Sequence, residues 1–481
     1  MANMNSFMPR IYLLVVWLTA AGPAVTEVQG DRQPFESPGD VTEACVAIRH
    51  VPDGIYSDAD TAAEQALCDI DFYSGSVALC PKTFSTSPGT LVYDLASGAY
   101  AGRGPDFEND HCHERRIIKR DVAGDPVSYK MTMNTPATSA TFAPAALLYY
   151  HFSRYFDTYV DVPVSVWRSM DRNVHYERVV QTGLDVSASG GSPMNRAGWE
   201  TLAQGAKDPT TYRPTSELYT DDGRQIFGIL LRSGGRRYGA EINGTRHSGW
   251  GAGQNRDFQE TAPFRALREE GTLSSAIAAG ISAAKQDPDL AKAMRTDPSP
   301  LQMMFWMTEL AEIVLLDFIF SQQDRVGNID YADYWYWIKD GKVEKAIARS
   351  AEPPPDAAGF APLKIRRSII NDNDAGGRIP YANFAKTTGM VANLRHFRAE
   401  TYIQLQQLAQ DFEAAGPLYQ WLWSSFGISE RQVAQIVKNT RQASRILRES
   451  CEAGRLRFSL DPHGLLLQEK VVDSNVSCDV T

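Results

Sequence analysis

The sequence lacks an excess of basic residues. Lysine and arginine together number 48, aspartate and glutamate number 58, and the formal net charge is −10. Proteins that bind nucleic acid place clusters of Lys and Arg against the phosphates, so this balance argues against a nucleic-acid partner. The net negative charge favours solubility and indicates little else about function.

A long apolar run is missing as well. A helix that crosses a membrane needs about 20 consecutive, predominantly apolar residues. The best candidate, residues 301–320, contains Glu309, Glu312 and Asp317, and the sequence therefore predicts no transmembrane segment. Disorder is also excluded, because 43% of the 481 residues are apolar and 22% are charged, which is typical of a globular protein with a full core.

The N-terminal residues have the pattern of an export signal. Arg10 precedes an apolar run at 11–18, and small residues follow that run. This pattern predicts a signal peptide over residues 1–30, with cleavage between Val25 and Asp31. The mature protein is then expected outside the cytosol: secreted, in the lumen of the secretory pathway, or in the periplasm.

Cysteine is scarce, and its even number predicts disulfides in an oxidising compartment. We expect Cys451 to pair with Cys478. The other four are expected to pair among themselves: Cys45, Cys68, Cys80 and Cys112. The alternative is a zinc site at residues 111–114, where His, Cys, His and Glu follow one another with ligand-like spacing.

Composition divides the rest of the chain into four segments. They are a Cys-containing segment at 31–125, a β-rich segment around one helix at 126–245, a mainly helical segment at 246–450, and a tail with a disulfide at 451–481. This order predicts an α+β fold with a β-rich N-terminal lobe and a mainly helical C-terminal lobe.

The clearest local patterns are strands around one helix. Apolar and polar residues alternate over 127–133, which predicts a strand with Lys130 on its polar face. A helix is predicted at 144–156 and a second strand at 162–166. Farther along, Ser299 stands as an N-cap before a proline and predicts the start of a long buried helix.

Two further stretches have weaker patterns. Residues 185–223 are rich in Gly, Ser and Pro and are predicted to be mostly loop. The segments at 226–231 and 237–242 flank Gly234 and Gly235, which predicts a β-hairpin.

The polar loop after the long helix is the first candidate for chemistry. It holds Asp324, Arg325, Asn328 and Asp330 within seven positions. Phosphoryl transfer needs a carboxylate that orients or accepts the acceptor hydroxyl's proton, and a nearby amide or carboxylate that holds a metal ion. An Asp/Asn pair on one loop meets both needs, although a solvated turn has the same composition.

A second polar stretch follows the predicted strand at 363–370. Asp372 and Asp374 stand at its end, and carboxylates at such a position can bind Mg²⁺ or Mn²⁺ through oxygen. Lys130 is a candidate for holding nucleotide phosphates. A weaker candidate for a phosphate-covering loop is the group Gly98, Gly102 and Gly104.

The joint order of these motifs resembles the Golgi casein kinase and four-jointed family of secretory-pathway kinases, and more distantly HipA and the phosphoinositide kinases. The resemblance rests on Leu316-Asp317-Phe318 followed by Asp324-Arg325. Three further stretches are similar to that family: residues 151–157 followed by Val162-Pro163-Val164, residues 370–373, and residues 241–244.

The resemblance implies a bilobal protein-kinase-like fold that uses ATP with Mg²⁺ or Mn²⁺. It implies Asp324 as the catalytic base, and a hydroxyl of a protein or a glycan as the acceptor. The residues it implies at the cofactor are Lys130, Glu241 and Arg325, and those at the metal are Asn328, Asp372 and Asp374.

Two departures from the family keep other functions open. Val326 stands where the family usually has histidine, and Ala146 stands where a helix glutamate would brace the lysine. One alternative is therefore a catalytically inactive pseudokinase that acts as a secreted binding or activating partner. Another is a kinase-fold transferase that moves AMP or glutamate.

Overall fold

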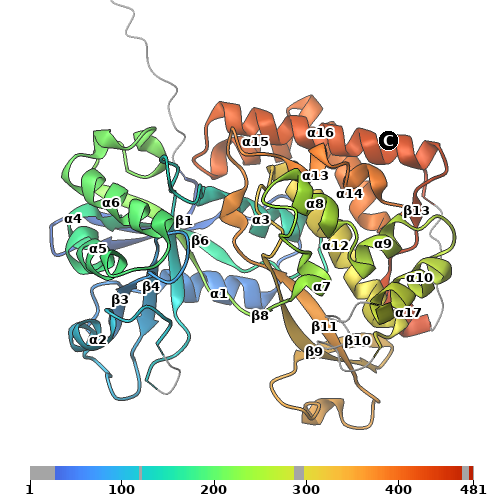
Figure 1. Cartoon of the computed structure of the whole chain (residues 1–481), viewed down its shortest axis with the longest axis horizontal. Coiled ribbons are helices and arrows are strands. Elements are labelled where there is room, and N and C mark those ends of the chain that lie inside the picture. The colour runs from blue at the N-terminus through green and yellow to red at the C-terminus, as the bar shows by residue number, and fades with distance from the viewer. Residues whose placement is uncertain (1–27, 119–121, 287–296, 469–475, 480–481) are drawn as a thin grey trace, which may run out of the picture.

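A computed structural model describes residues 28–118, 122–286, 297–468 and 476–479. Almost all of the predicted signal peptide lies outside these residues. The secondary structure is mixed, and the two larger sheets are antiparallel, which confirms the α+β class. Figure 1 shows a sheet-containing part on the left and a mainly helical part on the right.

Seven strands form the large antiparallel sheet, in the spatial order β1-β2-β6-β7-β5-β4-β3. They are β1 (Gly30–Glu36), β2 (Thr42–Ile48), β3 (Val77–Pro81), β4 (Thr90–Asp94), β5 (Val127–Met131), β6 (Ser165–Asp171) and β7 (Gln225–Leu231). Because β4 pairs with β5, the expected segment boundary at 125/126 falls inside one sheet. β6 begins three residues later than the predicted strand.

The described residues of this part contain six α-helices: α1 (Asp58–Cys68), α2 (Gly104–His111), α3 (Pro144–Tyr155), α4 (Arg172–His175), α5 (Gln181–Ala188) and α6 (Pro193–Lys207). The prediction of α3 is confirmed, but the loop predicted at 185–223 is wrong over α5 and α6. Pro193 opens α6 at its first turn, and Trp199 and Leu202 are buried, so packing stabilises this Gly- and Ser-rich stretch as helix.

The hairpin predicted around Gly234 and Gly235 is also wrong. β7 is already paired on both sides, with β5 and with β6. The chain therefore crosses to the second part, where β8 (Arg236–Arg237) pairs with β9 (Ile329–Lys339) and α7 (Ala240–Asn243) follows.

The second part is built around α12 (Pro300–Phe320), in which every residue after Pro300 is buried. Ser299 caps this helix as predicted, and its side chain accepts a hydrogen bond from the Gln302 backbone. The other helices are α8 (Ala252–Phe258), α9 (Ala262–Arg268), α10 (Leu273–Gln286), α13 (Phe384–Thr387), α14 (Ala399–Ala414), α15 (Pro417–Ser425), α16 (Glu430–Glu452) and α17 (Pro462–Gln468). Among the helices of the described residues, none is long and apolar enough to cross a membrane.

A smaller sheet brings two polar loops together. β9 lies between β10 (Lys342–Ile347) and β11 (Leu363–Ile370), and β11 confirms the strand predicted at 363–370. The loop that carries Asp324 enters β9, and the loop that carries Asp372 leaves β11 at the same end, where Ile370 pairs with Ile329. A parallel pair, β12 (His396–Phe397) and β13 (Arg457–Phe458), joins the chain after α16 to the helical part.

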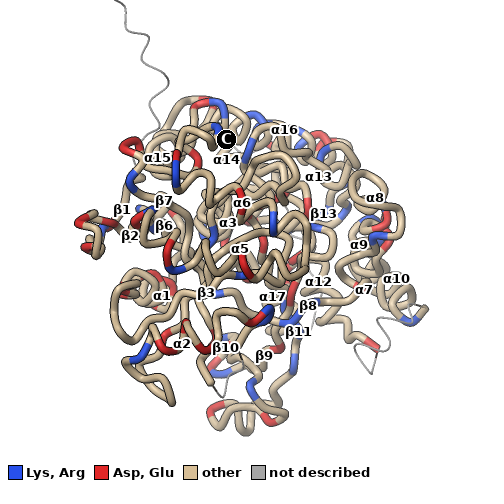
Figure 2. Tube along the Cα trace, turned by 60° about the vertical axis from the view of Figure 1, so that its left-hand side comes forward, with Lys and Arg blue, Asp and Glu red and all other residues tan. Residues whose placement is uncertain are grey.

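Three disulfides link Cys45 to Cys68, Cys80 to Cys112 and Cys451 to Cys478. The predicted pair at the C-terminus is confirmed, and the other four cysteines pair among themselves as expected, in a connectivity that the sequence left open. These disulfides are compatible with a secreted or lumenal protein. Basic and acidic residues are interspersed along the chain (Figure 2).

Candidate functional site

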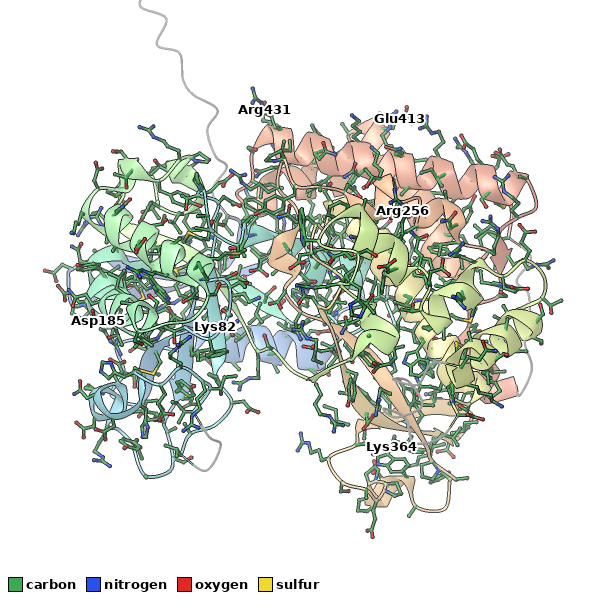
Figure 3. The ribbon with its side chains drawn as sticks, viewed as in Figure 1. Lys82, Asp185, Arg256, Lys364, Glu413 and Arg431 are labelled. Carbon is green, nitrogen blue, oxygen red and sulfur yellow. A yellow bond between two sulfur atoms is a disulfide. The ribbon has the colours of Figure 1, made fainter. Side chains whose placement is uncertain are left out.

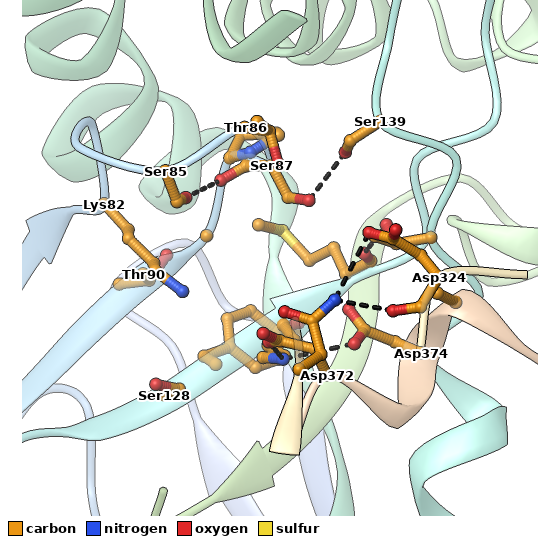
Figure 4. Close-up of a pocket in the computed structure, with 18 residues that line it drawn as sticks. Lys82, Ser85, Thr86, Ser87, Thr90, Ser128, Ser139, Asp324, Asp372 and Asp374 are labelled. Atoms are coloured by element: carbon orange, nitrogen blue, oxygen red, sulfur yellow. Dashed lines mark hydrogen bonds and ion pairs between the residues drawn. The ribbon is translucent and has the colours of Figure 1, made fainter. Parts of the chain in front are cut away.

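A pocket between the two parts brings five of the predicted site residues together (Figure 4). One side is formed by the loop between β3 and β4 and by β5. The other side is formed by the two polar loops of the second part. The predicted residues that line it are Lys130, Asp324, Asn328, Asp372 and Asp374.

Lys130 lies in the middle of the large sheet and reaches across the pocket. Its Nζ atom lies 2.8 Å from Asp372 Oδ1 and 3.1 Å from Asp374 Oδ1. Burial by itself lowers the pKa of this amine, but the two carboxylates outweigh burial and raise the pKa above its usual range. The lysine is therefore held charged at the base of the pocket.

Asp372 and Asp374 stand on a tight turn at the end of β11. Asp372 has left-handed backbone angles, with φ of 53°, a conformation that aspartate tolerates better than most residues. Lys130 chiefly holds the pKa of Asp372 far below its usual range. The carbonyl oxygen of Asp374 accepts a hydrogen bond from the Phe142 backbone 2.6 Å away, which ties this turn to the start of α3.

Asp324 is positioned by the end of α12 and by its own loop. The helix stops at Ser321, whose φ is 53°, and the chain turns into the pocket. The amide of Asn328 donates to the Asp324 carbonyl at 2.6 Å, and Arg246 Nη2 lies 3.3 Å from Asp324 Oδ1. Burial raises the pKa of Asp324 although Arg246 opposes this rise. A carboxylate with a raised pKa is a better proton acceptor.

Arg325, which was expected at the cofactor, does not line the pocket. Its guanidinium is buried and paired with Asp317, from Nε to Oδ2 and from Nη2 to Oδ1, both at 2.9 Å. It also donates to the Asn371 carbonyl at 3.1 Å and to Asn373 Oδ1 at 2.9 Å. The arginine therefore joins α12 to the two polar loops.

Glu241 is likewise absent from the pocket lining and is buried in α7, where it accepts a hydrogen bond from the Gly239 backbone at 3.1 Å. Its neighbour Asn243 has a positioning role that the sequence did not reveal. The Asn243 amide donates to the carbonyls of Tyr238 and Ile329 and accepts from the Ile329 backbone at 2.7 Å. It therefore fixes the point where the Asp324 loop enters β9.

Lys82 and the loop that follows it were missed by the sequence analysis. Lys82 follows β3, an edge strand of the large sheet, and its side chain lines the pocket (Figures 3 and 4). Burial and then the nearby charge of Lys130 lower its pKa. Hydroxyl groups line the same side, from Ser85, Thr86 and Ser87. The only signal was a Ser/Thr-rich turn between two strands.

The loop between β3 and β4, and not the predicted glycine-rich segment, lies at the pocket. Gly98, Gly102 and Gly104 are not among the residues that line the pocket. They lie beyond β4, and Gly104 begins α2, where its backbone donates to the Gly75 carbonyl.

Arg237 is a second missed residue. It lies in β8, and its Nη1 atom donates to Asn328 Oδ1 at 2.5 Å. Its Nη2 atom lies 3.5 Å from Asp372 Oδ2. Sequence patterns placed it in the strand of a hairpin, and only the pairing of β8 with β9 brings it to the polar loops.

No acidic side chain on α3 braces Lys130, since the helix contains neither Asp nor Glu. Ala146 is buried where a glutamate was considered. Asp372 and Asp374 take the role of counter-charge for the lysine.

The oxygens of Asn328, Asp372 and Asp374 are of the hard type that Mg²⁺ and Mn²⁺ prefer. Each of these side chains already contacts a cationic nitrogen of Lys130 or Arg237, so the group is built to surround positive charge. No cluster of three or more His, Cys, Asp or Glu side chains in the described ranges is arranged to hold a metal. A divalent ion here would need the Asn328 amide and oxygens from a nucleotide or water to complete its shell.

The alternative zinc site at residues 111–114 is wrong. Cys112 forms the disulfide with Cys80, which removes its thiolate. His111 contacts Glu114 through Nδ1 and the Tyr100 hydroxyl through Nε2, so its two ring nitrogens have protein partners.

Comparison with known proteins adds no relative. No protein-family model matches the chain, and the search of curated proteins finds no match either. The kinase resemblance therefore stays a prediction based on motifs and on the geometry of the pocket.

Proposed function

We propose that the protein is a secreted ATP-dependent kinase that transfers phosphate to a hydroxyl of a protein or glycan. The proposal rests on one observation: residues from distant parts of the chain converge on one pocket with the chemistry that phosphoryl transfer needs. Lys130 comes from β5 of the large sheet, Asp324 and Asn328 from the loop after α12, and Asp372 and Asp374 from the end of β11.

The fold supports a bilobal kinase-like arrangement. Residues 30–231 contain the seven-stranded sheet, and residues 240–468 are mainly helical around α12. The pocket is lined by residues of both parts, and the chain passes between them once, through residues 232–239. A cleft between two lobes is where the family places its nucleotide.

In the proposed reaction the acceptor oxygen bonds to the γ-phosphorus of ATP, the bond to the β–γ bridging oxygen breaks, and ADP leaves; a divalent ion would neutralise charge on the phosphates. The residues of the chain bind the phosphates and accept the proton. Lys130 and Lys82 place positive charge at the phosphates, and the Ser/Thr-rich loop of residues 82–89 offers hydroxyl and backbone donors. Asp324 accepts the proton of the acceptor hydroxyl, and Asn328 holds Asp324 by donating to its carbonyl oxygen.

A second candidate is a nucleotide-binding partner without catalytic activity. The observation that favours it is the engagement of all three expected metal ligands by cationic side chains, together with the absence of an acidic residue on α3. In this reading Lys130 and Arg237 supply the charge that a metal supplies in an active kinase, and nucleotide binds without turnover.

Incubation with ATP, Mn²⁺ and mixed protein and glycan acceptors, followed by intact-mass analysis, separates these functions. Added phosphate supports the kinase, added AMP or glutamate supports the other transferase, and nucleotide binding without any product supports the inactive partner. For the kinase, Asp324→Asn should lower transfer by about 10²–10⁴-fold with little change in nucleotide binding or stability. Lys130→Ala should weaken ATP binding first.

A matched control is Asp340→Asn, at an exposed turn between β9 and β10 where φ is 51°. Asparagine tolerates this backbone as well as aspartate does, so stability and transfer should not change. If Asp324→Asn keeps full phosphate transfer at normal stability, the assignment of the base is wrong.

A further inference from the structure

Arg237 holds the side chains that the proposed function assigns to a metal ion. Its guanidinium donates to Asn328 Oδ1 at 2.5 Å and approaches Asp372 Oδ2 at 3.5 Å. The same guanidinium also contacts the Gly327 carbonyl and Asp330 Oδ1. One positive charge thus lies between the amide and the carboxylate that are expected to bind a cation.

Both oxygens of Asp372 are engaged by positive charge. Lys130 contacts Oδ1 and Arg237 contacts Oδ2. The two cations are anchored differently: the side chain of Lys130 is 10% exposed and lies in the central sheet, whereas that of Arg237 is 44% exposed and lies in the two-residue strand β8. Arg237 is therefore the group that can leave.

Arg237 and a divalent ion cannot occupy the same oxygens, Asn328 Oδ1 and Asp372 Oδ2, at the same time. A guanidinium and a divalent ion at a few ångströms repel each other strongly, and each oxygen lone pair serves one of them. The ion pair between Arg237 Nε and Asp330 Oδ1 lies away from the expected ligands. Asp330 can therefore keep hold of the arginine while Nη1 and Nη2 are displaced.

We infer that Arg237 and a divalent cation bind Asn328 and Asp372 alternately. This inference rests on the metal ligands of the proposed function. In the state described here Arg237 keeps the ligands together and neutralises Asp372. Entry of the cation requires that Nη1 and Nη2 leave, so Arg237 lowers the affinity of the site for the cation and sets the concentration at which the site fills.

The test measures binding of Mn²⁺ itself, without ATP and without an acceptor, through the electron paramagnetic resonance signal of free Mn²⁺. Arg237→Ala removes both the competitor and its charge and should tighten Mn²⁺ binding about tenfold or more. Arg237→Gln keeps a hydrogen-bond donor without the charge and should tighten it as well, which covers a failure of the alanine variant to fold.

The matched control is Arg236→Ala. Arg236 is the neighbouring residue of β8 and pairs with Asp333, away from the expected ligands. Its replacement should leave Mn²⁺ affinity unchanged. Equal or weaker Mn²⁺ binding by folded Arg237 variants would overturn the inference, and so would absence of Mn²⁺ binding in all proteins. Failure of the kinase proposal is a separate result, because phosphate transfer plays no part in this measurement.

Discussion

Replacement of Arg325 tests whether this residue positions the site or binds the cofactor. Arg325 and Asp317 form a pair whose side chains are 4% and 6% exposed, with two contacts of 2.9 Å. Arg325→Met removes the guanidinium and leaves the Asp317 carboxylate buried with the Tyr149 hydroxyl as a remaining partner, 2.7 Å away. The fold must then accommodate an uncompensated buried charge.

The size of the effect follows from burial and from the lost hydrogen bonds. Breaking a buried ion pair by removal of one partner costs about 3–5 kcal/mol. The lost bonds to the Asn371 carbonyl and to Asn373 Oδ1 add to this, at about 0.5–1.5 kcal/mol each. Domains are stable by only about 5–15 kcal/mol, so Arg325→Met should lose a large fraction of the free energy of unfolding.

The assay is urea unfolding, measured in parallel with nucleotide binding and phosphate transfer. Asp317→Leu should be destabilised to a similar degree, and the double variant should lose less than the sum of both, because neither charge remains buried alone. Arg265→Met, which breaks an exposed pair with Glu260, is the control and should cost about 1 kcal/mol or less.

A direct cofactor contact makes the opposite prediction. If Arg325 binds ATP, its replacement weakens nucleotide binding at normal stability, and Asp317→Leu leaves binding unchanged. A normal urea midpoint for Arg325→Met would refute the positioning role.

Nucleotide binding and pH provide two further tests. ATP should raise the melting temperature only with Mg²⁺ or Mn²⁺ present, because Asp372 and Asp374 repel the phosphates, and Asp372→Ala should abolish this shift more completely than Asp374→Ala. A full shift with chelator would contradict this. Burial lowers the pKa of His175 from 6.5 to about 3. Between these pH values the unfolded chain binds a proton at this histidine and the folded protein does not. The contribution of neutral His175 to the free energy of unfolding is therefore full above pH 6.5. It falls by about 1.4 kcal/mol per pH unit as the pH is lowered toward 3. His175→Gln should show a shallower acid slope in urea unfolding, and an unchanged slope would exclude this account.

Local sequence patterns predicted those helices and strands that depend mainly on interactions between residues close together in the chain. Ser299 before a proline marked the start of α12, and alternation around Lys130 marked β5, because caps and periodicity act within a few residues. The same rules failed at 185–223, where small and polar residues indicated loops. There the burial of Trp199 in tertiary contacts outweighed weak local preferences.

The residue types of the candidate site were readable in the sequence, and their roles were not. The chemistry of Asp324, Asn328 and Asp372 follows from the side chains themselves, and the structure brings them to one pocket. An arginine such as Arg325 can bind phosphates, so its residue type was compatible with a cofactor ligand. In the structure its side chain is buried against Asp317 instead of lining the pocket. A side chain's direction depends on neighbours that are distant in sequence.

The sequence by itself determined the α+β class, the even set of disulfide cysteines and the polar loops that follow α12 and β11, because each depends on composition or short-range order. Only the tertiary structure placed Lys82 and Arg237 at the pocket. Lys82 arrives there because β4 pairs with β5, and Arg237 because β7 has no free edge and β8 must pair with β9. Strand pairing joins residues that are distant along the chain, and no local pattern specifies which edge remains free.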